Sequence, residues 1–184
     1  MSEINLEEEH DFPLVEILLK ERPLGKRTYQ PINDPRLAGW EVGRKDSPER
    51  LKYILEHLEG KTVLDIGCAE GYFSREIAKQ GFEVTAIDFR PNIIEVAKYL
   101  SISEGVNVQY HTGRWKDIIG ELSFFDNILH LSVLHNDIKG LGIEKALVGL
   151  QALRNKATRV FLETPRGIRE RHTPDFLDFG TEES

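Results

Sequence analysis

Short apolar runs alternate with amphipathic stretches along most of this chain. Near-continuous apolar runs predict strands that are buried on both faces, and stretches with apolar residues three and four positions apart predict helices. Strands are predicted at 62–66, 83–87, 106–111, 125–131 and 159–163. Helices are predicted at 14–19, 47–58, 71–79, 91–103 and 143–153, and a turn or short helix at 115–120.

Alternating strands and helices connect by right-handed crossovers, which make the strands parallel within one sheet. We therefore expect an α/β fold with a Rossmann-like, doubly wound, mostly parallel sheet and helices on both faces. After the fifth strand the chain is polar, with a short pairing around 176–179 as the remaining candidate.

Helix breakers divide the chain into three parts. Residues 1–46 form an N-terminal extension, in which a short helix precedes a segment at 26–46 that proline and glycine make irregular. Ser47, with Pro48 and an acid after it, is a strong helix start and opens the core at 47–164. Residues 165–184 form a polar tail.

Composition excludes several classes of protein. The chain has 184 residues, 40% of them hydrophobic, which suits one globular domain with a sizeable core. A net charge of −7 disfavours nucleic acid as a partner. We interpret the basic stretch at 22–45 as a solvated face, and the alternative, that it binds nucleic acid, stays open. No run approaches the roughly 20 apolar residues of a membrane span, and the acidic N-terminus is no signal peptide. The single cysteine, Cys68, fits a reducing compartment, so we expect a cytoplasmic protein. No Cys or His spacing matches a metal site, and the oligomeric state stays open.

A glycine-bearing turn follows the first core strand. Gly67 and Gly71 have no Cβ, so a ligand approaches the backbone closely beside the next helix N-terminus. The dinucleotide pattern Gly-x-Gly-x-x-Gly needs glycine where the chain has Ala69 and Tyr72. This mismatch disfavours a nicotinamide oxidoreductase. A nucleoside ligand that carries no pyrophosphate remains compatible with the turn.

An acidic residue ends the second core strand. Asp88 follows Gly67 by 21 residues, close to the spacing of about 20 expected for an acid that binds ribose hydroxyls. Phe89 is placed to cover an adenine face. The alternative is that Asp88 only caps the helix that starts near Pro91.

Four segments together resemble the motifs of class I S-adenosylmethionine-dependent methyltransferases: 63–71, 84–88, 110–116 and 125–132. The resemblance implies S-adenosylmethionine as cofactor and S-adenosylhomocysteine as product. In family members the sheet continues with an antiparallel hairpin, and this chain is too short to contain it in the usual form. Three explanations stay open: the chain is a minimal form, it is a piece of a longer protein, or the fold is completed by a strand pairing that the sequence pattern does not show. The implied cofactor-binding residues are Tyr29, Arg44, Asp65, Gly67, Cys68, Ala69, Gly71, Asp88, Phe89, Arg114, Trp115 and Leu131.

A narrower resemblance concerns the acceptor. Residues 131–135, 140–142 and 160–163 resemble the methyltransferase part of bacterial O-antigen chain-terminating enzymes, and 29–44 is similar to the segment that closes over their cofactor. That group methylates a terminal phosphate on a polysaccharide. Methyltransferases that act on RNA 5′-phosphates and on tRNA wobble uridine share part of the pattern, so the acceptor stays open.

For methyl transfer from S-adenosylmethionine, the main task of the protein is to align the acceptor atom with the methyl group and to exclude water. A sulfonium methyl is already activated, so a phosphate oxygen needs no general base, whereas a hydroxyl or amine loses a proton. His135, just past the fourth strand, is the candidate base; the alternative is an ordinary loop histidine. A phosphate acceptor would call for converging arginines, for which the candidates are Arg44, Arg90 and Arg114.

The main hypothesis is methyl transfer to an oxygen or nitrogen of a small-molecule or glycan-phosphate acceptor. An RNA or tRNA methyltransferase is the first alternative, and the acidic balance disfavours it. A non-catalytic protein that binds S-adenosylmethionine is the second.

Overall fold

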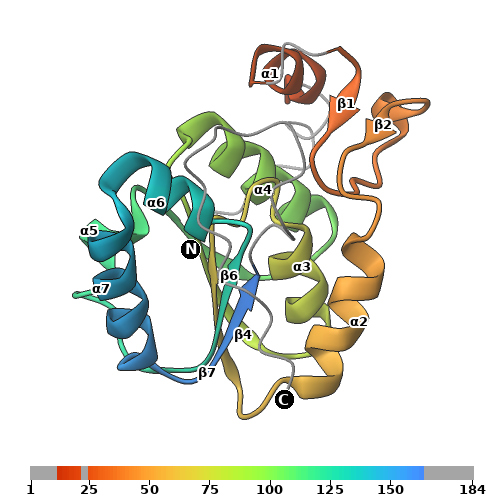
Figure 1. Ribbon diagram of the computed structural model, residues 1–184. Coiled ribbons are helices and arrows are strands. Elements are labelled where there is room, and N and C mark those ends of the chain that lie inside the picture. Colours follow the sequence, from red (N-terminus) through yellow and green to blue (C-terminus); the bar gives the residue numbers. More distant parts are fainter. Residues whose placement is uncertain (1–11, 22–24, 164–184) are drawn as a thin grey trace.

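The computed structural model describes residues 12–21 and 25–163 (Figure 1). The N-terminal elements are α1 (Leu14–Glu21), β1 (Arg27–Thr28), the 3-10 helix η2 (Pro35–Leu37) and β2 (Glu41–Val42). The remaining elements are α2 (Ser47–His57), β3 (Thr62–Ile66), α3 (Tyr72–Lys79), β4 (Glu83–Asp88), α4 (Pro91–Ser103), β5 (Val108–Thr112), α5 (Trp115–Ile118), β6 (Phe125–Leu131), α6 (Leu134–Leu141), α7 (Ile143–Arg154) and β7 (Ala157–Glu163).

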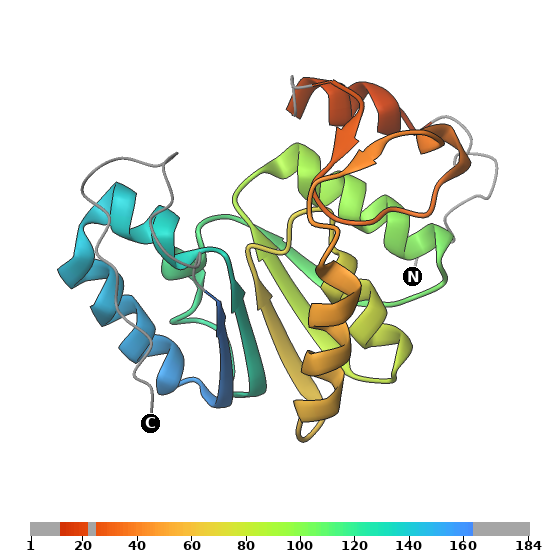
Figure 2. The ribbon, with the colours of Figure 1, turned by 45° about the vertical axis from the view of Figure 1, so that its right-hand side comes forward.

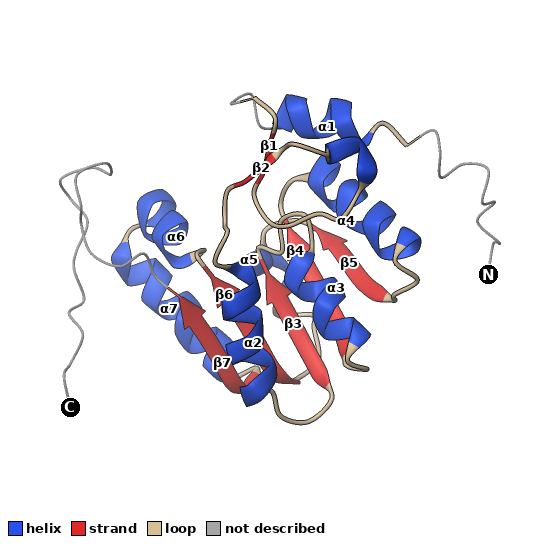
Figure 3. Ribbon diagram, turned by 90° about the vertical axis from the view of Figure 1, so that its right-hand side faces the viewer, coloured by secondary structure: helices blue, strands red, loops and turns tan. Residues whose placement is uncertain are grey.

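The main sheet confirms the predicted fold class. Its five strands run parallel in the order β5-β4-β3-β6-β7 (Figure 3). The chain winds outward from β3 to β4 and β5, then returns to β6 on the other side of β3. This reversal places a topological switch point between β3 and β6, where doubly wound sheets bind their ligands.

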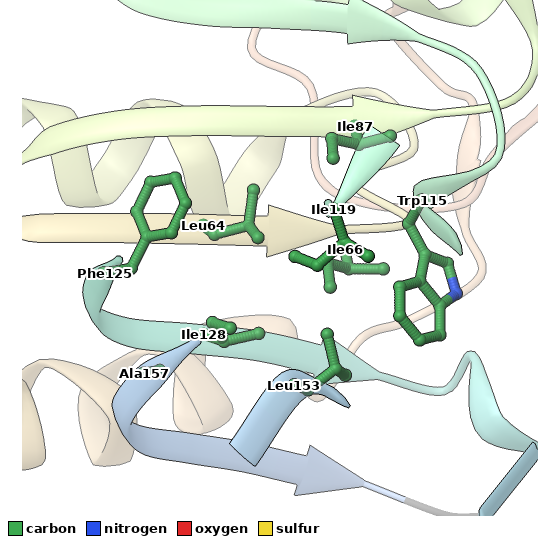
Figure 4. Close-up of a cluster of buried hydrophobic side chains, with 9 residues drawn as sticks. All are labelled: Leu64, Ile66, Ile87, Trp115, Ile119, Phe125, Ile128, Leu153 and Ala157. Atoms are coloured by element: carbon green, nitrogen blue, oxygen red, sulfur yellow. The ribbon is translucent and has the colours of Figure 1, made fainter. Parts of the chain in front are cut away.

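Helices cover both faces because neighbouring strand residues point to opposite sides. Val63 packs in a cluster with Phe73 and Ile77 of α3 and residues of α2. The next residue, Leu64, points to the other face and joins Trp115 of α5 and Leu153 of α7 (Figure 4). Figure 2 shows α6 and α7 on one side of the sheet and α2 and α3 on the other.

The segment 26–46 is less irregular than predicted. β1 and β2 pair in parallel at Arg27 with Glu41 and at Thr28 with Val42. Asp34 caps η2 between them by accepting a hydrogen bond from the Arg36 N–H (2.9 Å). Strands of two residues are too short to show an alternation of apolar and polar residues, so the sequence does not predict this pairing. Before this segment, α1 packs on α4 through apolar side chains that include Leu14 and Leu18.

A second difference from the predicted elements is the helix α6, for which the sequence predicts no helix. Leu134, Ile138 and Leu141 stand four and three positions apart and carry the helical signal. Gly140 and Gly142 weaken that signal, because glycine is a poor helix residue and a common helix end.

None of the helices within 12–21 and 25–163 is both long and apolar enough to cross a membrane. The candidate pairing at 176–179 lies outside the described residues, and the division at 46/47 falls just before α2 and remains a prediction.

Candidate active site

A cavity of about 650 Å³ opens at the carboxyl ends of β3, β4 and β6, beside the switch point. Its walls come from the turns after these strands, from α5, from the start of α6 and from the N-terminal segment. The lining residues are Tyr29, Gly67, Ala69, Ile87, Asp88, Phe89, Arg90, Gly113, Arg114, Trp115, Lys116, Asp117, Leu131, Ser132, Val133, His135, Asn136, Asp137 and Leu141.

The turn after β3 depends on glycine at both ends. Gly67 has φ +72° and a Cβ there would lie 2.6 Å from Cγ2 of Val133. Gly71 has φ +75° and a Cβ there would lie 2.7 Å from the Tyr110 hydroxyl. Between them Ala69 also adopts a positive φ of 50°, and its N–H donates to Asp88 Oδ2 at 3.1 Å. The turn is thereby held open toward the cavity and tied to the end of β4.

Asp88 ends β4 with its side chain buried beside this turn. Only 4% of the residue is exposed, so its charge needs hydrogen-bond donors. Arg90 supplies them through its backbone N–H, through Nε (3.0 Å to Oδ1) and through Nη2 (3.2 Å to Oδ2). Arg90 is the N-cap residue of α4, so through the Arg90 N–H Asp88 also binds the backbone at the start of that helix.

A second polar cluster links three elements at the far wall of the cavity. Asp137 of α6 accepts a hydrogen bond from Nε1 of Trp115 (3.3 Å) and lies 3.3 Å from Nζ of Lys116. Nε2 of the buried His130 lies 3.6 Å from the same carboxylate, and its ring meets Trp115 edge-on. Burial acts to raise the pKa of Asp137, but His130 and Lys116 outweigh it and hold that pKa below its ordinary value. Asp137 therefore sits in this wall as a carboxylate.

The N-terminal strap, residues 25–46, reaches the cavity at Tyr29. Tyr29 lines the cavity, and its N–H donates to Oε1 of the buried Glu70 (3.1 Å). Gln30 accepts a hydrogen bond from the Tyr72 N–H at the start of α3 (2.9 Å). At the other end of the strap, Arg44 reaches the sheet. These contacts join the strap to the turn after β3 and to the start of α3.

Arg44 binds the rim beside the cavity. Its Nη1 donates to Ser132 Oγ (3.0 Å) and its Nη2 pairs with Glu163 Oε1 (2.9 Å). The carboxylate of Asp46 accepts hydrogen bonds from Nε and Nη2 of the same guanidinium, both at 3.0 Å. Ser132 lines the cavity with a positive φ of 57°, and its Oγ donates to Glu163 at 2.8 Å.

Nine of the residues predicted for the site line the cavity: Tyr29, Gly67, Ala69, Asp88, Phe89, Arg114, Trp115, Leu131 and His135. Four others do not: Arg44, Asp65, Cys68 and Gly71. Their roles toward a cofactor stay predictions.

Two of these four are buried ionisable groups. Asp65 accepts a hydrogen bond from Ser74 Oγ (2.6 Å), and burial raises the pKa of Asp65 to about 6. Burial also raises the pKa of the Cys68 thiol, which makes it a packing residue rather than a nucleophile.

Of the three candidate arginines, Arg90 and Arg114 line the cavity and Arg44 does not. Arg44 and Arg90 are each paired with carboxylates. The side chain of Arg114, which is exposed on the cavity wall, makes no hydrogen bond or ion pair with the residues that the structure describes. Sequence reasoning missed Ser132 and Asp137, because no local pattern marks a polar residue that meets its partners only through tertiary packing. Within the described ranges, no group of His, Cys, Asp and Glu is arranged to hold a metal ion.

The geometry agrees with the comparisons with known proteins. Residues 63–153, from β3 to the end of α7, match the family model described as a methyltransferase domain. Among curated proteins, a ubiquinone biosynthesis O-methyltransferase of Xanthomonas euvesicatoria is 37% identical over 93 residues, 49% of this chain and 39% of that protein. The corresponding protein of Xylella fastidiosa is 38% identical over 93 residues, 49% of this chain and 38% of its own.

Solved structures extend the similarity beyond the family match. The bifunctional kinase-methyltransferase WbdD aligns over 78% of this chain at 27% identity with a TM-score of 0.66, and the chain covers 33% of that protein. The chain thus spans less than half the length of these curated relatives and of WbdD.

Proposed function

Because the chain carries a class I S-adenosylmethionine-dependent methyltransferase domain, we propose that it transfers a methyl group to an oxygen of a small-molecule acceptor. One observation carries the proposal: the glycine turn and Asp88 face the same cavity at the switch point of a doubly wound sheet. The curated relatives support oxygen as the acceptor atom, since their names describe O-methyltransferases.

The residues present fit this cofactor. Gly67 and Ala69 leave the backbone open for the methionine part, and Asp88 faces the same space as an acceptor for ribose hydroxyls. Phe89, 64% exposed, and Trp115 offer aromatic faces for adenine. When bound, S-adenosylmethionine supplies a methyl group on a positively charged sulfur, ready for in-line displacement.

The work of the protein is then to hold the acceptor and exclude water. Ser132, His135 and Asn136 line the cavity where β6 passes into α6, close to the glycine turn. Val133 lies against Gly67 and closes the space between them. For a hydroxyl acceptor we assign His135 as the group that takes the proton.

A glycan phosphate is the finer proposal for the acceptor. Its support is the resemblance of 131–135 and 160–163 to phosphate methyltransferases, together with Arg114 as a cation on the cavity wall. A phosphate oxygen is already anionic and attacks without a base. We further propose that the protein acts in the cytoplasm, because its single cysteine is a free thiol.

The test is a transfer assay with methyl-labelled S-adenosylmethionine and a panel of acceptors: phosphorylated sugars, phenols, small amines and RNA. We expect label on a phosphate or phenol oxygen, and no transfer by Asp88→Ala. Titration calorimetry with S-adenosylmethionine and NAD provides the control for cofactor identity. Label on RNA alone, or binding of NAD in place of S-adenosylmethionine, would contradict the proposal.

A further inference from the structure

The carboxylate of Asp88 has all of its acceptor positions occupied. A carboxylate offers about four lone-pair positions to hydrogen-bond donors. Oδ1 accepts from the N–H and Nε of Arg90, both at 3.0 Å. Oδ2 accepts from the Ala69 N–H at 3.1 Å and from Arg90 Nη2 at 3.2 Å. A ribose diol that binds Asp88 must therefore replace donors that are already there.

Only one of these donor groups can leave without unfolding the site. The N–H groups of Ala69 and Arg90 are held by the turn after β3 and by the start of α4. The guanidinium of Arg90 belongs to a long side chain that is 25% exposed and lines the cavity. Its Cζ lies 5.7 Å from the centre of the Phe89 ring, which is 64% exposed. The displaceable donors are thus Nε and Nη2.

We propose that Arg90 determines cofactor affinity and selectivity by occupying the ribose positions on Asp88. A nucleoside binds there by displacing the guanidinium, and its two vicinal hydroxyls replace the two side-chain hydrogen bonds. The inference rests on the proposed function, because it takes Asp88 as the ribose acceptor.

Selectivity follows from the burial of Asp88. A ligand without the diol that displaces Arg90 leaves a carboxylate, only 4% exposed, without enough donors, and an unsatisfied buried charge is costly. A nucleoside without the diol therefore leaves Arg90 in place on Asp88, and Arg90 competes only with nucleosides that carry the vicinal diol.

The chain contains a matched control for this contact. Arg36 binds Asp34 in the same way, with its N–H (2.9 Å) and Nε (3.0 Å) on Oδ1 and its Nη2 (2.7 Å) on Oδ2. Neither residue lines the cavity. A change at Arg36 removes an equivalent Asp-x-Arg contact outside the cavity, together with the hydrogen bonds of Arg36 to the Phe12 carbonyl and the Tyr99 hydroxyl.

The experiment measures binding by titration calorimetry to wild type, Arg90→Met and Arg36→Met, with S-adenosylhomocysteine as the ligand. Methionine keeps an unbranched stem and removes the donors. We expect Arg90→Met to bind roughly tenfold more tightly, because a charge-assisted contact no longer competes, and Arg36→Met to match wild type. Adenosine should show the same gain in Arg90→Met, and 2′,3′-dideoxyadenosine should show none.

A second measurement uses wild type, in case Arg90→Met fails to fold in a thermal unfolding control. The nitrogen-15 resonance of Arg90 Nε, assigned by its loss in Arg90→Lys, should move toward the position of solvent-exposed arginines on saturation with S-adenosylhomocysteine. A resonance that stays in place, or equal or weaker binding by folded Arg90→Met, would overturn the inference while wild-type binding upholds the proposed cofactor. Failure of both wild type and Arg90→Met to bind would overturn the proposed function and the inference together.

Discussion

At the scale of single residues, His135 is the group whose role depends most on the acceptor. It lies at the start of α6 and lines the cavity. A hydroxyl acceptor must lose its proton during transfer, whereas a phosphate oxygen has none to lose. The two candidate acceptor classes therefore predict different consequences for the same substitution.

We expect His135→Ala to lower kcat by about 10²-fold for a phenol or hydroxyl acceptor, the usual contribution of a general base. With a phosphorylated sugar, kcat should stay within a few-fold of wild type. His57→Ala, at an exposed position of α2, is the control. An equal loss with both acceptor classes would make His135 a positioning residue instead of a base.

At the scale of elements, α6 depends on a carboxylate for its place on the sheet. Asp137 joins it to Trp115 and Lys116 of α5 and to His130 of β6. A charge held this way stabilises the folded state as long as it is ionised. Because the folded pKa of Asp137 is depressed, that stabilisation is present above the unfolded pKa of about 3.9 and is lost as pH falls through the folded value.

The corresponding prediction concerns Asp137→Asn, which keeps an acceptor for Trp115 but removes the charge. Urea unfolding at pH 7 should show a loss of about 2 kcal/mol in the free energy of unfolding. The difference from wild type should shrink as the pH is lowered below about 4. Glu144→Gln, an exposed acid at the start of α7, should change little. A loss that is independent of pH would point to packing rather than charge.

At the scale of the whole molecule, Arg44 joins segments that are far apart in the chain. Its contact with Glu163 spans 119 positions and connects the N-terminal strap to the last strand of the sheet. The two side chains are 24% and 28% exposed, so the pair adds little to global stability. Its consequence is local, because the same strap carries Tyr29 into the cavity wall.

We expect Arg44→Met to leave the free energy of unfolding within about 1 kcal/mol of wild type. The strap should open more often, so trypsin should cleave faster after the exposed Lys26 and Arg27, as followed by mass spectrometry. Affinity for S-adenosylhomocysteine should fall a few-fold. Lys98→Met, which breaks an exposed pair with Glu95 on α4, is the control, and unchanged cleavage in Arg44→Met would contradict the link.

Local patterns in the sequence predicted much of the fold. The apolar runs at 62–66 and 125–131 are strands at those bounds, and 91–103 is a helix at its predicted bounds. Their signals lie within one element, in side-chain periodicity and in breakers that end it. The sequence did not predict the β1–β2 pairing, because strands of two residues show no period. It did not predict α6, because glycines weaken the helical pattern there.

The sequence by itself determined the class of fold, the glycine turn and the spacing of Asp88, because periodicity, missing Cβ atoms and spacing are properties of neighbouring residues. Only the tertiary structure decided which side chains meet. It placed Arg44 on Glu163, gathered Asp137 with His130 and Trp115, and brought Ala69 to Asp88. Such contacts depend on how the elements pack on the sheet, and no pattern within a single element records that packing.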